Sequence, residues 1–157
     1  MNLKFIINLI IMIIFLSCDN TSTNPDNETT TTGGDETNLI EIYYGTDIQD
    51  GQLSIANPNL DNVAGFQFEL TGASIYLDAS GGLAEEYGFT VQVGEGTGII
   101  LGVDLSGGTI PGNSSGILTN ISVSEIFSSI CIENVILANE YGQAITDIII
   151  GEHCIEY

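Results

Sequence analysis

From Leu39 onward the chain alternates between short apolar runs and clusters of Gly, Asn, Asp and Ser. The segment from Val63 to Leu70 has the clearest pattern, with apolar and polar residues taking turns along it. In an extended chain Phe66 and Phe68 fall on one side and Gln67 falls on the other. This period of two predicts a strand with one face in a core and the other in solvent.

The same reasoning predicts a series of short strands separated by turn-forming residues. They cover residues 39–44, 52–56, 63–70, 73–77, 89–93, 99–105, 116–124, 130–137 and 144–150. Residues 81–87 are expected to hold one helical turn, and no long helix is predicted. About nine short strands at roughly 8–12-residue spacing indicate an all-β sandwich or barrel.

The N-terminus has a different pattern. Lys4 precedes an apolar run from Phe5 to Leu16. The run has about 12 residues, whereas a helix that crosses a bilayer needs about 20. A short positive segment followed by a short apolar run is typical of a secretory signal peptide, which we expect to comprise residues 1–17.

The end of that run, Phe15-Leu16-Ser17-Cys18, resembles a bacterial lipobox. The resemblance implies that Cys18 receives a diacylglycerol, that the chain is cut before it, and that the new amino group is acylated, for example with palmitate. Two or three lipid chains would anchor the protein stably, because each buried methylene contributes about 0.8 kcal/mol and one chain alone binds marginally. An ordinary secretory signal with a chance cysteine is the alternative. We therefore expect a lipid-anchored protein of the bacterial cell envelope that faces the periplasm or the exterior.

The segment after Cys18 is of low complexity, with four consecutive Thr residues and almost no apolar ones. Such a composition cannot bury a core. We expect residues 18–38 to form a disordered spacer. The remaining residues, 39–157, are enough for one domain.

Charge narrows the range of partners. Lys4 is the only Lys or Arg in a chain with 21 Asp and Glu residues and a formal net charge of −20. All the acidic residues follow Cys18, so the processed chain has no strong base. It cannot neutralise phosphates, which argues against nucleic acid as a partner. A neutral glycan, a basic protein surface or divalent cations remain compatible, and solubility alone would also account for the charge.

Two cysteines remain after Cys18 is lipidated, namely Cys131 and Cys154. In an extracytoplasmic compartment they are expected to form a disulfide. Closing a loop of about 22 residues is worth roughly 3 kcal/mol in the chain-entropy model. A buried thiol at Cys131 and a metal pair with His153 are the alternatives.

Several segments resemble cohesin-like domains, which are related to cellulose-binding modules. The segment Val63-Ala64-Gly65-Phe66-Gln67-Phe68-Glu69-Leu70 is similar to a strand signature of that group. Residues 88–102, 111–123, 130–135 and 139–142 resemble its later strands, and their order and spacing agree. The resemblance implies a nine-stranded jelly-roll sandwich. The cysteine pair departs from most cellulosomal cohesins, which favours a stand-alone surface adhesin or scaffold.

Catalytic chemistry is not indicated. His153 is the only His and lies near the C-terminus, whereas a catalytic triad needs a His held between a carboxylate and a nucleophile. Glu85 and Glu86 are adjacent, and adjacent residues of a strand face opposite ways, so they do not suit a glycosidase pair. We expect a protein that is not an enzyme and needs no cofactor.

Acidic residues in predicted loops are the candidate ligands for calcium. Asp47, Asp50 and Asp61, the last followed by Asn62, are expected in loops, where oxygen ligands can hold Ca²⁺. They do not follow the EF-hand spacing.

The function expected is therefore recognition of a protein partner, dockerin-like by resemblance, or of a polysaccharide. The chain has no Trp, so a sugar-binding platform would need tyrosines. The candidates are Tyr43, Tyr44, Tyr76, Tyr87 and Tyr141. Strand parity puts Tyr43 and Tyr44 on opposite faces, so at most one of them joins a platform. The lack of Trp favours a protein partner. A structural envelope protein with no specific ligand is the alternative.

The first prediction concerns the anchor. Cys18→Ser removes the only thiol that the lipobox resemblance assigns to lipidation, so the protein should move from the detergent phase to the aqueous phase in phase partitioning of whole cells. Cys131→Ser is the control and should leave the partitioning unchanged. Equal partitioning of wild type and C18S would contradict the lipid anchor.

Overall fold

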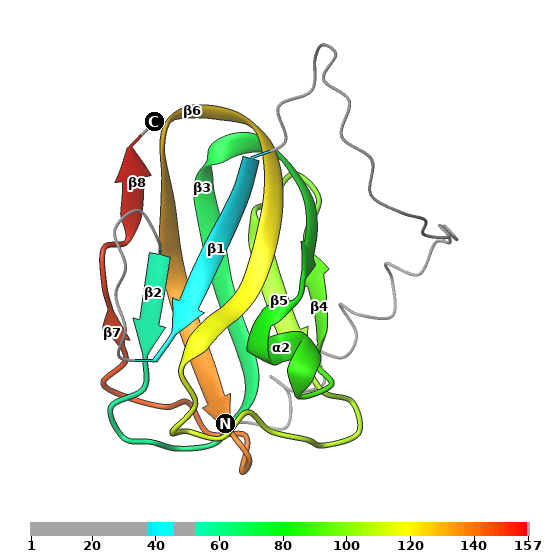
Figure 1. The fold of residues 1–157 in the computed structure, drawn as a ribbon, viewed down its shortest axis with the longest axis vertical. Coiled ribbons are helices and arrows are strands. Elements are labelled where there is room, and N and C mark those ends of the chain that lie inside the picture. Colours follow the sequence, from blue (N-terminus) through cyan, green and yellow to red (C-terminus); the bar gives the residue numbers. More distant parts are fainter. Residues whose placement is uncertain (1–37, 46–52, 157) are drawn as a thin grey trace. The chain divides into compact units, whose positions relative to one another are not determined.

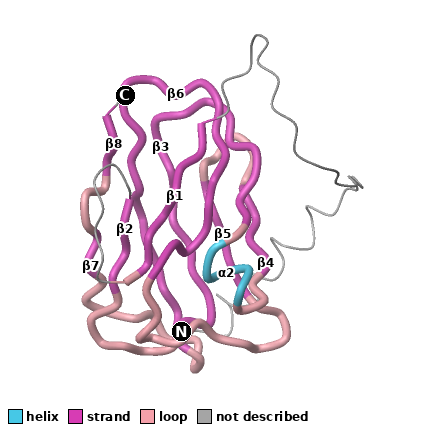
Figure 2. Tube along the Cα trace, in the orientation of Figure 1, coloured by secondary structure: helices cyan, strands magenta, loops and turns pink. Residues whose placement is uncertain are grey.

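The computed structural model describes residues 38–45 and 53–156 (Figure 1). The predicted signal peptide, Cys18 and the spacer up to residue 37 lie outside the described residues. The described part holds eight strands and one short helix, and Figure 2 shows how strands dominate it. The elements are β1 (Asn38–Tyr44), β2 (Leu53–Ala56), β3 (Val63–Ser80), α2 (Gly82–Glu86), β4 (Thr90–Val93), β5 (Ile99–Val103), β6 (Gly116–Asn139), β7 (Ile149–Ile150) and β8 (Cys154–Glu156).

The strands form one hydrogen-bonded sheet that folds over on itself. Their order is β4-β5-β3-β6-β1-β2-β7, and β8 pairs with β6. β1 and β2 are parallel, and the other pairs are antiparallel. The fold is a β-sandwich, which confirms the predicted all-β jelly-roll class.

Two long strands connect the layers. The first half of β3 pairs with β5 and with the second half of β6, through partners such as Phe66 and Leu137. The second half of β3 pairs with the first half of β6, through partners such as Ala79 and Ile121. That first half of β6 also pairs with β1, so β3 and β6 belong to both layers. In Figure 1 both strands arch over at the top of the sandwich.

The bend depends on one close approach of backbones. Gly72, with a φ of 97°, lies at the corner of β3, and a Cβ atom there would come within 1.9 Å of the Ser129 carbonyl oxygen. On the paired strand β6, Glu125 takes a φ of 53°. Between Ala73, which pairs with Ile126, and Thr71, which pairs with Cys131, the register shifts. Only glycine suits a positive φ at a contact this close.

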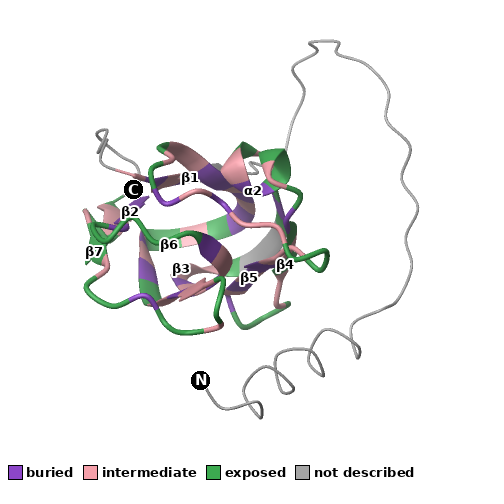
Figure 3. Cartoon of the chain, turned by 90° about the horizontal axis from the view of Figure 1, so that it is seen from below, coloured by how far each residue is buried: buried purple, intermediate pink, exposed green. Residues whose placement is uncertain are grey.

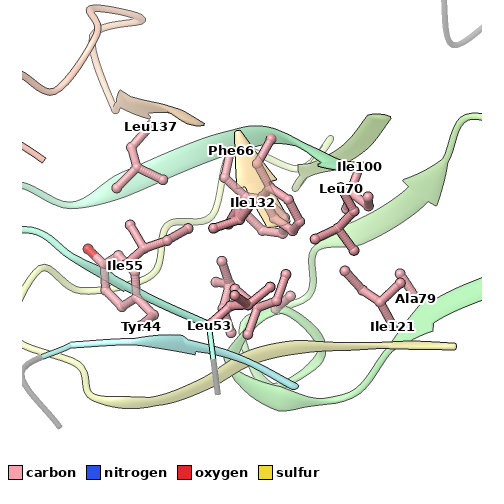
Figure 4. Close-up of a cluster of buried hydrophobic side chains, with 14 of the residues drawn as sticks. Tyr44, Leu53, Ile55, Phe66, Leu70, Ala79, Ile100, Ile121, Ile132 and Leu137 are labelled. Atoms are coloured by element: carbon pink, nitrogen blue, oxygen red, sulfur yellow. The ribbon is translucent and has the colours of Figure 1, made fainter. Parts of the chain in front are cut away.

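The core fills the space between the layers. Phe66, Ile132, Leu70 and Leu137 face the other layer, whose side chains include Tyr44, as Figure 4 shows. The fully buried large side chains are Tyr44, Phe66, Phe68, Ile42, Leu53, Ile55, Leu70, Ile100, Ile110, Leu118 and Ile121. These alternate with outward positions, as strand geometry requires. The alternation predicted from the sequence for residues 63–70 is confirmed.

One glycine in the core makes room for an aromatic ring. A Cβ on Gly102 would lie 2.1 Å from Cζ of Phe66, so the ring packs directly over the backbone of β5. Phe66 also stacks with Phe68 and Phe89, with ring centroids 6.0 Å apart in each pair. Stacked rings contribute beyond the area that they bury.

The predicted strands differ from the observed ones in four places. The strands predicted over 63–70 and 73–77 are one bent strand, β3, and those over 116–124 and 130–137 are one bent strand, β6. The strand predicted over 144–150 is limited to β7, with an isolated bridge from Ala144 to Ala138. β8 was not predicted. Eight strands therefore replace the nine expected. The helical turn predicted within 81–87 is present as α2.

Different parts of the chain lie at the two ends of the sandwich. Asn38, where β1 begins, pairs with Val123 of β6 close to the corner. Figure 1 shows that β1 begins at the same end as the arches of β3 and β6. The loops that follow β2, β5 and β6 lie at the other end. No helix within the described residues is long and apolar enough to span a membrane.

The second prediction tests the corner. Gly72→Ala should lower the free energy of unfolding by at least about 3 kcal/mol, because it adds a backbone clash to an unfavourable φ. Gly107→Ala is the matched control, since Gly107 has a φ of 88° and open space around it. The control should cost only about 1 kcal/mol, the cost of the φ alone. Equal losses in urea unfolding would show that the close approach is not what the fold requires.

Candidate functional site

The outer face of the sheet formed by β4, β5, the first half of β3 and the second half of β6 is a candidate binding surface. Its side chains are fixed by register, because the inward residues Phe66 and Ile100 are buried and their neighbours point outward. Gln67 pairs with Leu101 on one side and with Ile136 on the other. Gln92 of β4 pairs with Leu101 and completes a row across four strands. Figure 3, which views the molecule from below, shows buried and more exposed positions following one another along the strands.

No residue of this middle row is charged. The next row, toward the ends of β5 and β6, is also uncharged. It joins Thr90, Val103, Gly65 and Ala138. Within the paired strands of this face, the first carboxylates lie toward the corner, where Glu69 pairs with Glu133. A face without charge is notable in a chain whose net charge is −20.

The carboxylate of Glu69 is held in place. Asn134 Nδ2 donates a hydrogen bond to its Oε2 at 2.8 Å. Asn134 adopts a φ of 52°, a conformation that Asn tolerates better than most residues. The polar border of the uncharged face is therefore ordered.

Four of the five candidate tyrosines do not form a platform on the uncharged face, and the side chain of the fifth, Tyr76, lies outside the described part of the structure. Tyr44 is buried and Tyr43 is only partly exposed, which confirms that they point to opposite faces. Tyr87 caps the C-terminus of α2, and Tyr141 lies in the loop between β6 and β7. Each of these four tyrosines lies outside the uncharged face. A row of stacked sugars therefore finds no aromatic support there.

The calcium candidates are not brought together. Asp47 and Asp50 lie outside the described residues. Asp61 is exposed in the loop between β2 and β3, and the Asn62 side chain accepts a hydrogen bond from Gly112 N at 3.3 Å. Among the described residues no group of three His, Cys, Asp or Glu side chains could hold a metal ion.

Asp61 instead borders a buried polar pair. Asn57 Nδ2 donates to Tyr44 Oη at 3.0 Å and to the Asp61 carbonyl oxygen at 2.6 Å. Burial raises the pKa of Tyr44, the hydrogen bond from Asn57 lowers it, and the Asp61 carboxylate raises it, with a net increase. The Tyr44 phenol thus stays neutral and fixes the loop to the end of β1.

Cys131 and Cys154 form a disulfide between directly paired residues of β6 and β8. Ile132 N donates to the His153 carbonyl oxygen at 2.7 Å beside it. β8 has only three residues, so the covalent bond secures a strand that few hydrogen bonds hold. The disulfide also lies next to the corner of β6.

The remaining chemical candidates are dispersed. His153 is exposed next to the disulfide. Glu85 and Glu86 are exposed on α2, the helical turn predicted within residues 81–87. Cys18 lies outside the described residues. The uncharged face was not singled out from the sequence, because it depends on which strands are neighbours, and only the alternation over residues 63–70 pointed to it.

Comparison with known proteins gives structural neighbours only. No family model matches the chain, and no curated protein matches it. A cohesin from Acetivibrio cellulolyticus scaffoldin B, solved with a Cel5 dockerin mutant, is similar with 13% identity and a TM-score of 0.39, covering 68% of this chain and 90% of that one. A chain from a complex of a CaDoc0917 variant with CaCohA2 has 14% identity, a TM-score of 0.43 and coverages of 69% and 92%.

A third neighbour comes from the Coh-OlpA–Doc918 complex, a type I cohesin–dockerin complex from Clostridium thermocellum. It has 18% identity and a TM-score of 0.39, and covers 69% of this chain and 91% of that one. All three TM-scores lie below 0.5, so the fold class stated above rests on this chain's own strands.

The third prediction concerns the disulfide. Replacing both Cys131 and Cys154 by Ser should lower the free energy of unfolding by about 3 kcal/mol, because the unfolded chain regains the entropy of an open loop. Urea unfolding of the oxidised wild type and of the double variant measures the difference. A reductant should bring the wild type to the variant's midpoint and leave the variant unchanged. Identical midpoints for oxidised wild type and variant would be the contrary result.

Proposed function

We propose that this protein is a lipid-anchored, extracytoplasmic, non-catalytic binding module whose partner is a protein. The observation that carries the proposal is the uncharged outer face of the sheet, with Leu101, Gln67 and Ile136 in its middle row. The core of a protein interface is depleted in charged residues. This face has that property in a chain that is strongly acidic elsewhere.

A protein fits the face better than a polysaccharide does. Sugar rings stack on exposed Trp or Tyr, and the chain has no Trp. Partly exposed aliphatic side chains such as Leu101 and Val103 contribute by burial against another apolar surface instead. The resemblance of the sequence segments to cohesins suggests the class of partner, a dockerin-like protein.

Two cysteine features support the proposed compartment and anchor. The Cys131–Cys154 disulfide is suited to an oxidising environment outside the cytoplasm. The resemblance of the segment ending at Cys18 to a lipobox supports attachment to a bacterial membrane by lipid. The acidic domain would be repelled by anionic headgroups, so a covalent lipid is a suitable means of attachment.

The fourth prediction tests the face. Leu101→Arg places a charge at its centre and should abolish capture of a specific partner from extracts of the source organism. Ser122→Arg is the matched control, because Ser122 of β6 lies between the buried Ile121 and Val123 in the other layer and points away from that layer's core. A protein counts as a specific partner if the wild type and S122R capture it and L101R does not.

Glycan arrays with the same three proteins complete the test. Binding of a glycan that L101R loses and S122R keeps would replace the protein partner by a polysaccharide. Identical capture by all three proteins, with no glycan bound, would overturn the binding function and favour a structural envelope protein.

A further inference from the structure

Three exposed apolar side chains occupy one end of the sandwich. Leu60, Leu105 and Tyr141 have exposed fractions of 62%, 73% and 79%. They are three of the six large hydrophobic residues that are exposed in the described part of the chain, and each comes from a different loop. Single exposed apolar residues are ordinary, but a group at one place calls for a physical explanation.

The topology places these three loops side by side. Leu105 follows β5, Leu60 precedes β3 and Tyr141 follows β6, and these strands are neighbours in the order β5-β3-β6. Antiparallel pairing brings the three chain ends to the same edge, where Gly65 lies between Val103 and Ala138. Neighbouring strands are about 4.8 Å apart, so the loops leave the sheet within about 10 Å of one another.

Contacts between the loops hold them together. Asn59 Nδ2 donates to the Thr146 carbonyl oxygen at 3.0 Å, which joins the loop before β3 to the one after β6. Val63 forms a bridge with Ile110, which joins the start of β3 to the loop after β5. A Cβ on Gly112 would lie 2.0 Å from the Leu60 carbonyl oxygen, so these backbones pack closely. The three apolar residues thus belong to one surface, which we call the loop-end surface.

Each apolar residue has a carboxylate beside it in the chain. The pairs are Leu60–Asp61, Asp104–Leu105 and Glu140–Tyr141. The hydrogen bond to Glu140 and its charge raise the pKa of Tyr141, which shows that the carboxylate lies next to the phenol. The described part of the chain contains no Lys or Arg to neutralise these charges.

Two of the loops are held rigid by their own side chains. Asp104 accepts hydrogen bonds from Ser106 N at 2.8 Å and from Gly108 N at 2.6 Å. The Ser106 hydroxyl, followed by these backbone donors, lowers the pKa of Asp104, so its carboxylate stays charged at neutral pH. Asn139 Oδ1 accepts from Tyr141 N at 3.1 Å and from Gln143 N at 2.9 Å. Rigid loops lose little entropy when a partner binds.

We infer that the loop-end surface binds a polypeptide segment in which Lys or Arg residues flank apolar ones. The apolar side chains of such a segment would be buried against Leu60, Leu105 and Tyr141, and its cations would lie against Asp61, Asp104 and Glu140. The inference rests on the proposed function as a protein-binding module, but it concerns a different surface from the uncharged sheet face. Charge complementarity selects the partner, since neither an anionic membrane nor a neutral glycan would use the carboxylates.

The experiment uses the full processed protein and a synthetic peptide of alternating Lys and Leu residues, with binding followed by fluorescence anisotropy. Two comparison peptides replace every Leu by Ser or every Lys by Glu. The Lys/Leu peptide should bind at least about tenfold more tightly than either, with an affinity that falls as salt is added. Equal binding of the Lys/Ser peptide would overturn the inference, because it would reflect the net charge alone. Absence of binding by the Lys/Leu peptide would overturn it as well.

Variants and mapping locate the contact. The triple variant L60S, L105S and Y141S should weaken binding about tenfold, since it removes the buried apolar area. Phe127→Ser is the matched control, because Phe127 is 70% exposed and belongs to the corner of β6. Amide resonances of residues 59–62, 104–108 and 139–143 should shift on titration. Shifts confined to the corner, or an affinity loss in F127S equal to that of the triple variant, would overturn the inference.

These results are separable from the test of the sheet face. L101R alters the middle of that face and leaves the three loop residues in place. Loss of the natural partner in L101R with unchanged peptide binding would support both surfaces independently. Unchanged peptide binding in the triple variant would reject the loop-end surface and leave the proposed function standing.

Discussion

The close approach of β3 to β6 at the corner is the constraint on which the rest of the structure depends. Gly72 lies against the Ser129 carbonyl oxygen, and the two strands bend together there from one layer into the other. Because they remain paired on both sides of the bend, the layers share two strands and stay in a fixed register. The inward positions of both layers then meet in one core. The orientation of every outward side chain on these strands follows from the same register.

The sequence predicted the class of fold from local periodicity, and it failed where local periodicity carries no information. Phe66 and Phe68 alternate with polar residues, so their strand and its buried face were predicted correctly. Gly72 looked like a turn between two strands, because a glycine signals a break equally well for a loop and for a bend. Whether the chain continues as a strand beyond it depends on pairing with β6, which is a long-range contact.

The candidate surfaces could not be predicted from the sequence for a related reason. Leu101 and Ile136 are ordinary apolar residues in the sequence, and only the pairing with Gln67 places them in one row. Leu60 and Tyr141 are far apart in the chain, and they lie at one end because β3 and β6 are neighbours. The cysteine pair could be proposed from the sequence, because only two thiols remained once Cys18 was assigned to lipid. The partner strand β8 could not, since three residues give too short a pattern.

The direction of β1 has a mechanical consequence. The strand begins near the corner at Asn38 and runs toward the opposite end. It is paired along its length with β6 on one side and, over Ile42 to Tyr44, with β2 on the other. If the chain is held by a lipid before Asn38 and a partner pulls on the loops at the far end, the load runs along β1 in shear. The hydrogen bonds across that load must break together rather than one after another. The domain would therefore resist tension along its long axis more strongly than its modest length of paired backbone suggests.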